Sequence, residues 1–225
     1  MKNKKGFTLT ELIVALGIIG TIAALSVPSI LNNINKRILA SQIKNIAASI
    51  QQLATDQMVQ YHTKNLADTD FGTASTLLTN SNFEIASTCS EDNPCWADSY
   101  KKISVSDNGK TYPVAFEEYG AVDSDVVSVK LKNGAVVGYS IALTTDYAPD
   151  GSWGLFYVDS NGLEEPNIAG RDFFAFHVTE TGKLVGTEDK GCHNPLYDSV
   201  EGAGLLCFTS LVNNNWKMPD NDSDY

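Results

Sequence analysis

The sequence predicts an α+β fold in which a long N-terminal helix packs on an antiparallel β-sheet of four to five strands. Two observations lead to this prediction. The first sixty residues combine a long apolar run with a helical repeat of apolar positions. After about residue 62, short runs of β-branched and aromatic residues alternate with turns rich in Asn, Asp, Ser and Thr. The helix and the sheet would bury each other's apolar faces.

The apolar run begins directly after a cluster of positive charges. Residues 12–35 contain no charged side chain. As a helix they would extend about 36 Å, which exceeds the roughly 30 Å of hydrocarbon in a bilayer. Three lysines precede the run: Lys2, Lys4 and Lys5. Positive charges of this kind favour an orientation in which the N-terminal end of the segment stays on the cytoplasmic side. An ordinary signal peptide cut near Ala23 is the alternative, but the length of the run and Glu11 at its start disfavour it.

The helical pattern continues beyond the apolar run, so one helix is expected from about residue 7 to about residue 60. Apolar residues recur at spacings of one, three or four, and they are Ile38, Leu39, Ile43, Ile46, Ala47, Ile50 and Leu53. The first half is apolar all round, whereas the second half has one face that must pack against another element. Pro28 should bend or locally open the helix, because it removes one backbone hydrogen bond.

The N-terminal stretch KKGFTLTELIVALGIIGTIAALSVPSI resembles the class III signal of type IV pilins and of the pseudopilins of type II secretion and DNA-uptake systems. The resemblance is close over residues 4–35 and extends to the rest of the chain only in architecture. It implies that a membrane peptidase cuts between Gly6 and Phe7 and that Phe7 is then methylated. It also implies that Glu11 is the acidic fifth residue of the mature protein and that Pro28 is the helix-bending proline.

A physical reason for Glu11 follows from this processing. A charged side chain deep in hydrocarbon costs roughly 2.5 to 3.5 kcal/mol and is usually paired. Cleavage frees the α-amine of Phe7, which is mostly cationic at neutral pH because its reference pKa is about 7.7 to 8.0. Glu11 and this amine are expected to pair, within one subunit or between neighbouring subunits. The alternative is that Glu11 simply lies at the level of the lipid headgroups.

The resemblance also implies a domain organisation and a location. Residues 1–6 would be a cleaved leader, residues 7–62 a long helix with its transmembrane and assembly segment at 7–35, and residues 63–225 an exported pilin-like domain. The protein would cross the bacterial inner membrane once and enter a periplasmic or extracellular filament. Expected partners are the prepilin peptidase, other pilin or pseudopilin subunits and an inner-membrane assembly platform.

The clearest β-structure is a hairpin formed by residues 127–131 and 136–143, with Asn133 and Gly134 supplying the turn. Further strands are expected at residues 112–116, 153–158, 173–178 and 183–185. A short helix around residues 205–213 would tuck Leu211 and Trp216 onto the domain.

Four cysteines lie in the part that would be exported, and they are Cys89, Cys95, Cys192 and Cys207. An even number in an oxidising compartment predicts two disulfides. Three connectivities are possible, and the pairs nearest in sequence are favoured. A bond between the last two would contribute about 3 kcal/mol in the chain-entropy model, and in pilins such a bond often pins a C-terminal loop. A zinc site that includes His193 is the competing interpretation.

One loop has the beginning of a calcium-binding pattern. Asp159, Asn161 and the following glycine resemble the start of such a loop, and Glu165 or Asp172 could complete an oxygen shell. The twelfth position, where the pattern needs an acid, is Gly170. Some secretion pseudopilins bind calcium in a C-terminal loop. The alternative is a plain turn between two strands, and no cofactor other than calcium is expected.

The expected function is structural. The chain has 27 acidic and 16 basic residues, a formal charge of −11, which argues against a nucleic-acid partner. The motif GYSIA at residues 138–142 loosely resembles a nucleophile elbow, but it lies in a predicted strand rather than at a strand-to-helix turn. We therefore expect a filament subunit and not an enzyme. The alternatives are a membrane-tethered or filament-tip binding module, and a secreted enzyme whose mature terminus lies near Ala24.

Overall fold

The computed structural model confirms the predicted α+β fold. It describes residues 8–73, 77–78, 83–90, 92–105, 111–115, 126–141, 151–188, 191–192 and 199–219. At residues 28–29, 32, 105, 111–115 and 201 the description is limited to the backbone. The chain divides into two compact units, Met1–Ile38 and Leu39–Tyr225.

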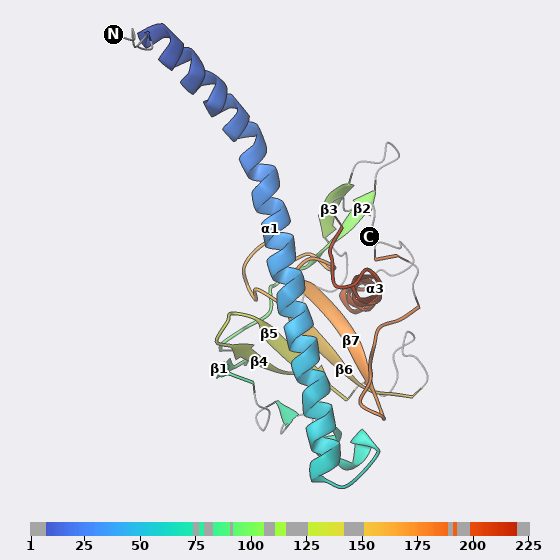
Figure 1. The fold of residues 1–225 in the computed structure, drawn as a ribbon. Helices are drawn as coiled ribbons and strands as arrows, with labels where there is room; N and C mark the ends of the chain where they lie inside the picture. Colours follow the sequence, from blue (N-terminus) through green and yellow to red (C-terminus); the bar gives the residue numbers. More distant parts are fainter. Residues whose placement is uncertain are drawn as a thin grey trace, which may run out of the picture. The chain divides into compact units, whose positions relative to one another are not determined.

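The predicted long helix is present as α1, which spans Leu9–Gln60 (Figure 1). Shortly after its end, His62 adopts a positive φ of 52°. Two 3-10 turns, η1 (Leu66–Asp68) and η2 (Asp70–Gly72), follow. The Asp70 carboxylate accepts hydrogen bonds from Tyr61 Oη at 2.7 Å and from Gln57 Nε2 at 3.1 Å. These bonds fasten the loop to the last turn of α1.

The main sheet has six strands, one or two more than the sequence predicted. Its order is β1-β4-β5-β6-β7-β8, and every neighbouring pair is antiparallel. The strands are β1 (Ile85–Thr88), β4 (Val127–Leu131), β5 (Val136–Ser140), β6 (Ser152–Asp159), β7 (Phe173–Thr179) and β8 (Leu184–Val185). The additional strand is β1, an edge strand whose sequence IAST carries too few large β-forming residues to be distinguished from a loop.

The predicted strand at residues 112–116 forms but does not join the main sheet. It is observed as β3 (Thr111–Ala115), which pairs with β2 (Lys101–Val105) in a separate two-stranded sheet. The partner strand β2 lies only a few residues before β3 in the sequence, but its run KKISV begins with two lysines, which are depleted in strands, and the sequence analysis did not identify it.

The predicted hairpin forms between β4 and β5. The Oδ1 atom of Asn133 accepts a hydrogen bond from the Ala135 amide at 3.1 Å, and Gly134 has a φ of 93°. The turn therefore uses glycine where a side chain would be strained. Strand β5 ends at Ser140, and residues 142–143 of the predicted strand lie outside the described residues.

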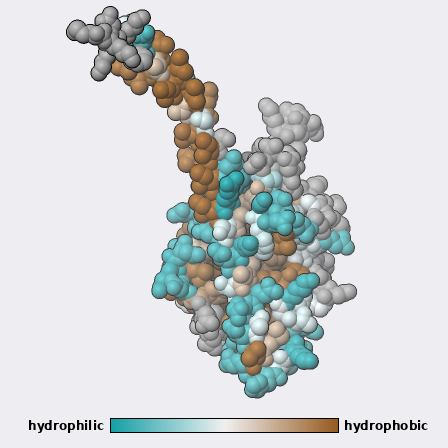
Figure 2. All heavy atoms as spheres, viewed as in Figure 1, coloured by the Kyte–Doolittle hydropathy of each residue, from teal (hydrophilic) through white to brown (hydrophobic). Residues whose placement is uncertain are grey.

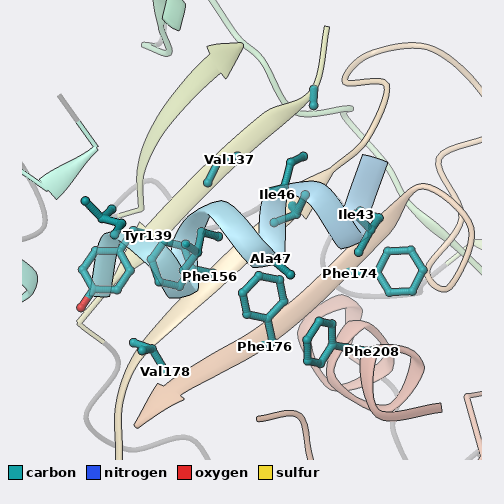
Figure 3. Close-up of a cluster of buried hydrophobic side chains, with 14 of the residues drawn as sticks. Ile43, Ile46, Ala47, Val137, Tyr139, Phe156, Phe174, Phe176, Val178 and Phe208 are labelled. Carbon is teal, nitrogen blue, oxygen red and sulfur yellow. The ribbon is translucent and has the colours of Figure 1, made fainter. Parts of the chain in front are cut away.

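The larger core lies between one face of the sheet and the second half of α1. Ile43 and Ile50 of the helix are fully buried, as are Tyr139, Phe156 and Phe176 of the strands. Figure 3 shows the helix side chains lying over β5, β6 and β7. The apolar repeat predicted from the sequence therefore faces the sheet.

The opposite face of the sheet carries a second, smaller core, and α3 (Val200–Asn213) contributes to both cores, with its Phe208 stacked on Phe176 of the larger one. The ring of Tyr100 lies 4.6 Å from that of Phe173 between centroids. Helix α3 starts five residues before the predicted position, because Ser199 caps it by accepting a hydrogen bond from the Gly202 amide at 2.9 Å. Trp216 is half-buried, and its ring lies edge-on to that of Phe208 at 5.8 Å.

Ile50→Ala should destabilise the domain by about 2 to 5 kcal/mol, because the removed methyl groups leave a cavity between helix and sheet. Chemical denaturation of the full chain in detergent, followed by near-ultraviolet circular dichroism, measures this change. Val59→Ala is the matched control, since that side chain is 68% exposed and its truncation should change stability by less than about 0.5 kcal/mol. Equal effects of the two substitutions would contradict the packing described here.

His177 should make the domain less stable in acid. Burial lowers the pKa of this histidine to about 4, from an ordinary value of 6.5. The unfolded chain therefore binds a proton that the folded chain rejects, and stability is lost as the pH falls from about 6.5 to about 4. Relative to His177→Phe, the natural protein should lose about 2 to 3 kcal/mol over this window. Denaturation at a series of pH values tests this, and parallel profiles of the two proteins would contradict it.

Candidate assembly site

The first part of α1 presents an apolar surface that nothing in the described chain covers. Among the described residues, Leu9–Val27 is the one segment long and apolar enough to cross a membrane, and none of it is buried inside the structure. Its large side chains are between 47% and 82% exposed; they are Leu9, Leu12, Ile13, Val14, Leu16, Ile18, Ile19, Ile22, Leu25 and Val27. In Figure 2 this segment is predominantly brown. Such a surface requires lipid or other apolar helices around it.

Glu11 lies at the N-terminus of this apolar helix and closes a capping box with Thr8. The Glu11 Oε2 atom accepts hydrogen bonds from the Thr8 amide at 2.8 Å and from its hydroxyl at 2.7 Å. In return, the Glu11 amide donates to Thr8 Oγ1 at 3.3 Å. Each residue thus satisfies a backbone N–H group that the first helical turn would leave without a partner.

The capping box leaves part of the Glu11 carboxylate available. Among the described residues, no hydrogen bond or ion pair reaches the second oxygen, Oε1. The negative charge is also placed at the positive end of the helix dipole, where it is favourable. Glu11 can therefore begin the helix through one oxygen and accept a cation through the other.

Other polar side chains of the apolar segment also find partners within the helix. Thr21 Oγ1 donates to the Ile18 carbonyl and Ser26 Oγ donates to the Ile22 carbonyl, each at 2.8 Å. A hydroxyl group without a partner would be costly in hydrocarbon. These hydrogen bonds make the segment compatible with an apolar surrounding despite its polar residues.

The remaining predicted residues of the processing and assembly site are only partly within the described structure. Gly6 and Phe7 lie outside the described residues. At Pro28 the backbone is helical and α1 continues through it. The bend at Pro28 therefore stays a prediction. Thr8 is a residue that the sequence analysis missed, although the pattern Thr-x-x-Glu before an apolar run is a readable sign of a capping box.

The structure pairs Cys89 with Cys95 and Cys192 with Cys207. This is the connectivity that the sequence analysis favoured, because it joins the cysteines nearest in sequence. Both sulfurs of the second bond lie against Gly170, which has a φ of 87° and where a Cβ atom would approach them to within 2.7 Å. This bond therefore joins α3, which contains Cys207, to the segment after β8 that contains Cys192, and it packs against the loop that follows β6. The two cysteines proposed as zinc ligands are joined to each other, and His193 lies outside the described residues.

The predicted calcium residues Asp159 and Asp172 are fully buried, and protein groups already engage their carboxylates. Asp159 accepts hydrogen bonds from Tyr100 Oη at 2.7 Å and from the amides of Asn161 and Gly162. Asp172 accepts from two backbone amides, Asn167 N at 2.7 Å and Ile168 N at 2.6 Å.

The other two predicted ligands are directed to different partners. Asn161 donates through Nδ2 to the carbonyls of Glu164 and Glu165, and Glu165 pairs with Lys101 at 2.9 Å. The four residues thus shape the loop in the structure. Among the residues that the structure describes, no three Asp, Glu, His or Cys side chains gather as metal ligands. Calcium binding by this loop stays a prediction.

Burial makes both aspartates harder to ionise. Burial, reinforced by the charge of Asp172, raises the pKa of Asp159 to about 7 despite its three hydrogen-bond donors. Burial also raises the pKa of Asp172 to about 6, although hydrogen bonds from four backbone amides, those of Ile168 and Asn167 foremost, oppose this. Both groups hold protons more tightly in the folded chain, so they favour folding at low pH and lose that contribution as the pH rises through about 6 to 7.

Comparison with known proteins identifies the N-terminal segment. Residues 1–27 match the sequence model of the prokaryotic N-terminal methylation motif. This motif is the class III signal typical of type IV pilins and pseudopilins. No curated protein and no solved structure matches the chain significantly.

Thr8→Val and Glu11→Gln should separate the two uses of the Glu11 side chain. Thr8→Val removes the capping hydroxyl and should destabilise the first turn of α1 by about 1 kcal/mol. Glu11→Gln keeps an acceptor for the Thr8 amide, and the capping box tolerates glutamine. Amide hydrogen exchange at Glu11 and Leu12 in micelles measures this difference. Faster exchange in the glutamine variant than in the valine variant would contradict the capping geometry.

Proposed function

We propose that this chain, which carries the N-terminal methylation motif, is the precursor of a structural subunit of a type IV pilus-like or type II secretion pseudopilus filament. The prepilin peptidase would cut it between Gly6 and Phe7 and methylate the new terminus. The subunit would wait in the inner membrane with residues 63–225 exported, and an inner-membrane assembly platform would then add it to the filament.

The single observation that carries this proposal is the exposed apolar part of α1 with a charged residue at its start. An apolar surface alone would fit any membrane anchor. A carboxylate fixed by a capping box at the first turn, with one oxygen available, fits a segment that must also recognise a cation within an apolar surrounding.

Assembly would exchange lipid contacts for contacts with neighbouring helices. Because hydrocarbon and packed side chains are similarly apolar, this exchange provides little net hydrophobic gain. The axial position of each subunit against its neighbour must then be set by a directional contact. The amine of Phe7 and Oε1 of Glu11 on neighbouring subunits supply one, since the pair is strong where water is excluded.

The processing step predicts a mature N-terminus at Phe7. The full chain should be expressed with its own prepilin peptidase and, in parallel, with an inactive peptidase, and both products examined by mass spectrometry. We expect a chain that begins at a methylated Phe7 in the first case and uncut protein in the second. A terminus near Ala24 would instead identify an ordinary secreted domain.

Glu11→Gln should be processed normally but assembled poorly. The substitution keeps the capping box and removes only the charge, so the yield of sheared filaments should fall about tenfold or more, the equivalent of about 1.4 kcal/mol per added subunit. Glu84→Gln is the matched control, because Glu84 is an exposed carboxylate of the β-domain (residues 63–225) and its oxygen lies 3.9 Å from Lys132 Nζ, too far for a strong ion pair. Normal filament yield from the Glu11 variant would contradict the proposed pairing.

A further inference from the structure

The chain leaves the main sheet after β1 and returns to it at β4, although these two strands are neighbours in the sheet. Residues 89–126 are therefore an insertion between two paired strands, and they contain the separate β2–β3 sheet. The disulfide between Cys89 and Cys95 closes the base of this insertion. Cys89 directly follows β1, and its amide still donates to the Ser128 carbonyl of β4 at 3.0 Å. The bond therefore fixes the point at which the insertion leaves the sheet.

Directly after this disulfide, Trp96 packs on the face of the sheet that carries the smaller core. Its indole N–H donates to Ser128 Oγ at 2.9 Å, and its ring lies edge-on to that of Phe173 at 6.2 Å between centroids. Gly138 of β5 provides the space, because a Cβ atom there would come within 2.9 Å of Trp96 Cζ2. Trp96 is the one large side chain in residues 96–99, so it is the main anchor of this stretch on the sheet.

The far end of the same stretch is held independently of the disulfide. Tyr100 is fully buried, and its Oη atom donates to Asp159 at 2.7 Å. The next residue, Lys101, begins β2, and its amide donates to the Asn167 carbonyl in the loop after β6 at 2.8 Å. Opening the disulfide would therefore free residues 90–99 and leave β2 and the main sheet in place.

The two disulfides differ in how well a reagent in solution can reach them. Cys89 is half-buried, whereas Cys192 is 2% and Cys207 0% exposed. Every described residue between Cys89 and Cys95 is exposed, namely Ser90, Asp92, Asn93 and Pro94. Thiol–disulfide exchange begins with attack of a thiolate on a sulfur that it can reach, and exposed disulfides are the labile ones. Exchange should therefore begin at Cys89.

We propose that the bond between Cys89 and Cys95 is a thiol–disulfide exchange site, and that its reduction by a dithiol releases Trp96 from the sheet. One thiolate of the dithiol attacks Cys89 Sγ to form a mixed disulfide, and Cys95 leaves as a thiolate that takes a proton from water. The second thiol of the dithiol, as its thiolate, then displaces Cys89, which is protonated in turn. The dithiol ends as a disulfide, and the protein gains two electrons and two protons. The Asn93 carbonyl oxygen lies 3.7 Å from Cys95 Sγ and can accept a hydrogen bond from the new thiol.

Reduction would open one part of the domain and not the whole. The larger core contains none of residues 90–99, and the bond between Cys192 and Cys207 stays closed. The smaller core loses the indole ring that covers it, so part of its apolar surface becomes accessible. This inference goes beyond the proposed function and does not depend on it, because it requires only the folded domain.

Limited reduction of the full chain in detergent tests which bond opens first. The oxidised protein is treated with increasing dithiothreitol, free thiols are capped with iodoacetamide, and the capped cysteines are mapped by mass spectrometry. Cys89 and Cys95 should be capped about tenfold or more faster than Cys192 and Cys207, because exchange depends on access to the sulfur. Equal rates, or earlier capping of Cys192 and Cys207, would overturn the proposed site.

Hydroxyl-radical footprinting of the same samples, after the reagents are removed, tests the release of Trp96. Oxidation of Trp96 should rise severalfold when the bond is open, whereas Trp153 and Trp216 are internal controls that should keep their rates. The double variant Cys89→Ser with Cys95→Ser should show the raised rate without any reductant or capping group. Unchanged oxidation of Trp96 would overturn the release, and equal increases at all three tryptophans would show global unfolding and overturn the local opening.

Discussion

The rest of the structure depends on one constraint: the first part of α1 exposes a continuous apolar surface that is unfavourable in water. Ten large side chains of Leu9–Val27 lie at least 47% exposed, and fully burying each would contribute about 1.5 to 3 kcal/mol. The polar groups of this segment obey the same constraint, since Thr8, Glu11, Thr21 and Ser26 bond to one another or to the helix backbone. The segment is thus constructed for an environment without water, whether that is lipid or the interior of a helical assembly.

Helix α1 performs two physical tasks along one continuous backbone. In the unit Leu39–Tyr225, its apolar face is part of the core that holds the six-stranded sheet, so this part of the helix is inseparable from the β-domain. In the unit Met1–Ile38, the segment Leu9–Val27 exposes apolar side chains all round, as expected of a segment surrounded by lipid or other helices. The disulfide between Cys192 and Cys207 and the buried aspartates belong to the first task, because the disulfide ties α3 to the segment after β8 and the aspartates hold the loop after β6.

The long helix and the β4–β5 hairpin could be predicted because their signals are local: a repeat of apolar residues in one case, Asn133-Gly134 in the other. The edge strand β1 could not, because its partner β4 comes much later in the sequence, and β2 could not, because its run KKISV begins with two lysines. Asp159 and Asp172 show a similar limit. Their spacing suggested calcium ligands, which stays a prediction, but it could not indicate that both side chains are buried and accept hydrogen bonds from backbone amides. Thr8, by contrast, was readable beforehand, since Thr-x-x-Glu is itself a capping signal.

The central claim is that the apolar part of α1 avoids water both before and after assembly. The substitution Leu16→Cys places a spin label in the middle of the exposed apolar surface. Its collision rates with oxygen and with a water-soluble nickel complex measure whether this surface is in contact with water. The account predicts high oxygen and low nickel accessibility in membranes, and low nickel accessibility again in sheared filaments. A label that collides freely with the nickel complex in either sample would contradict it.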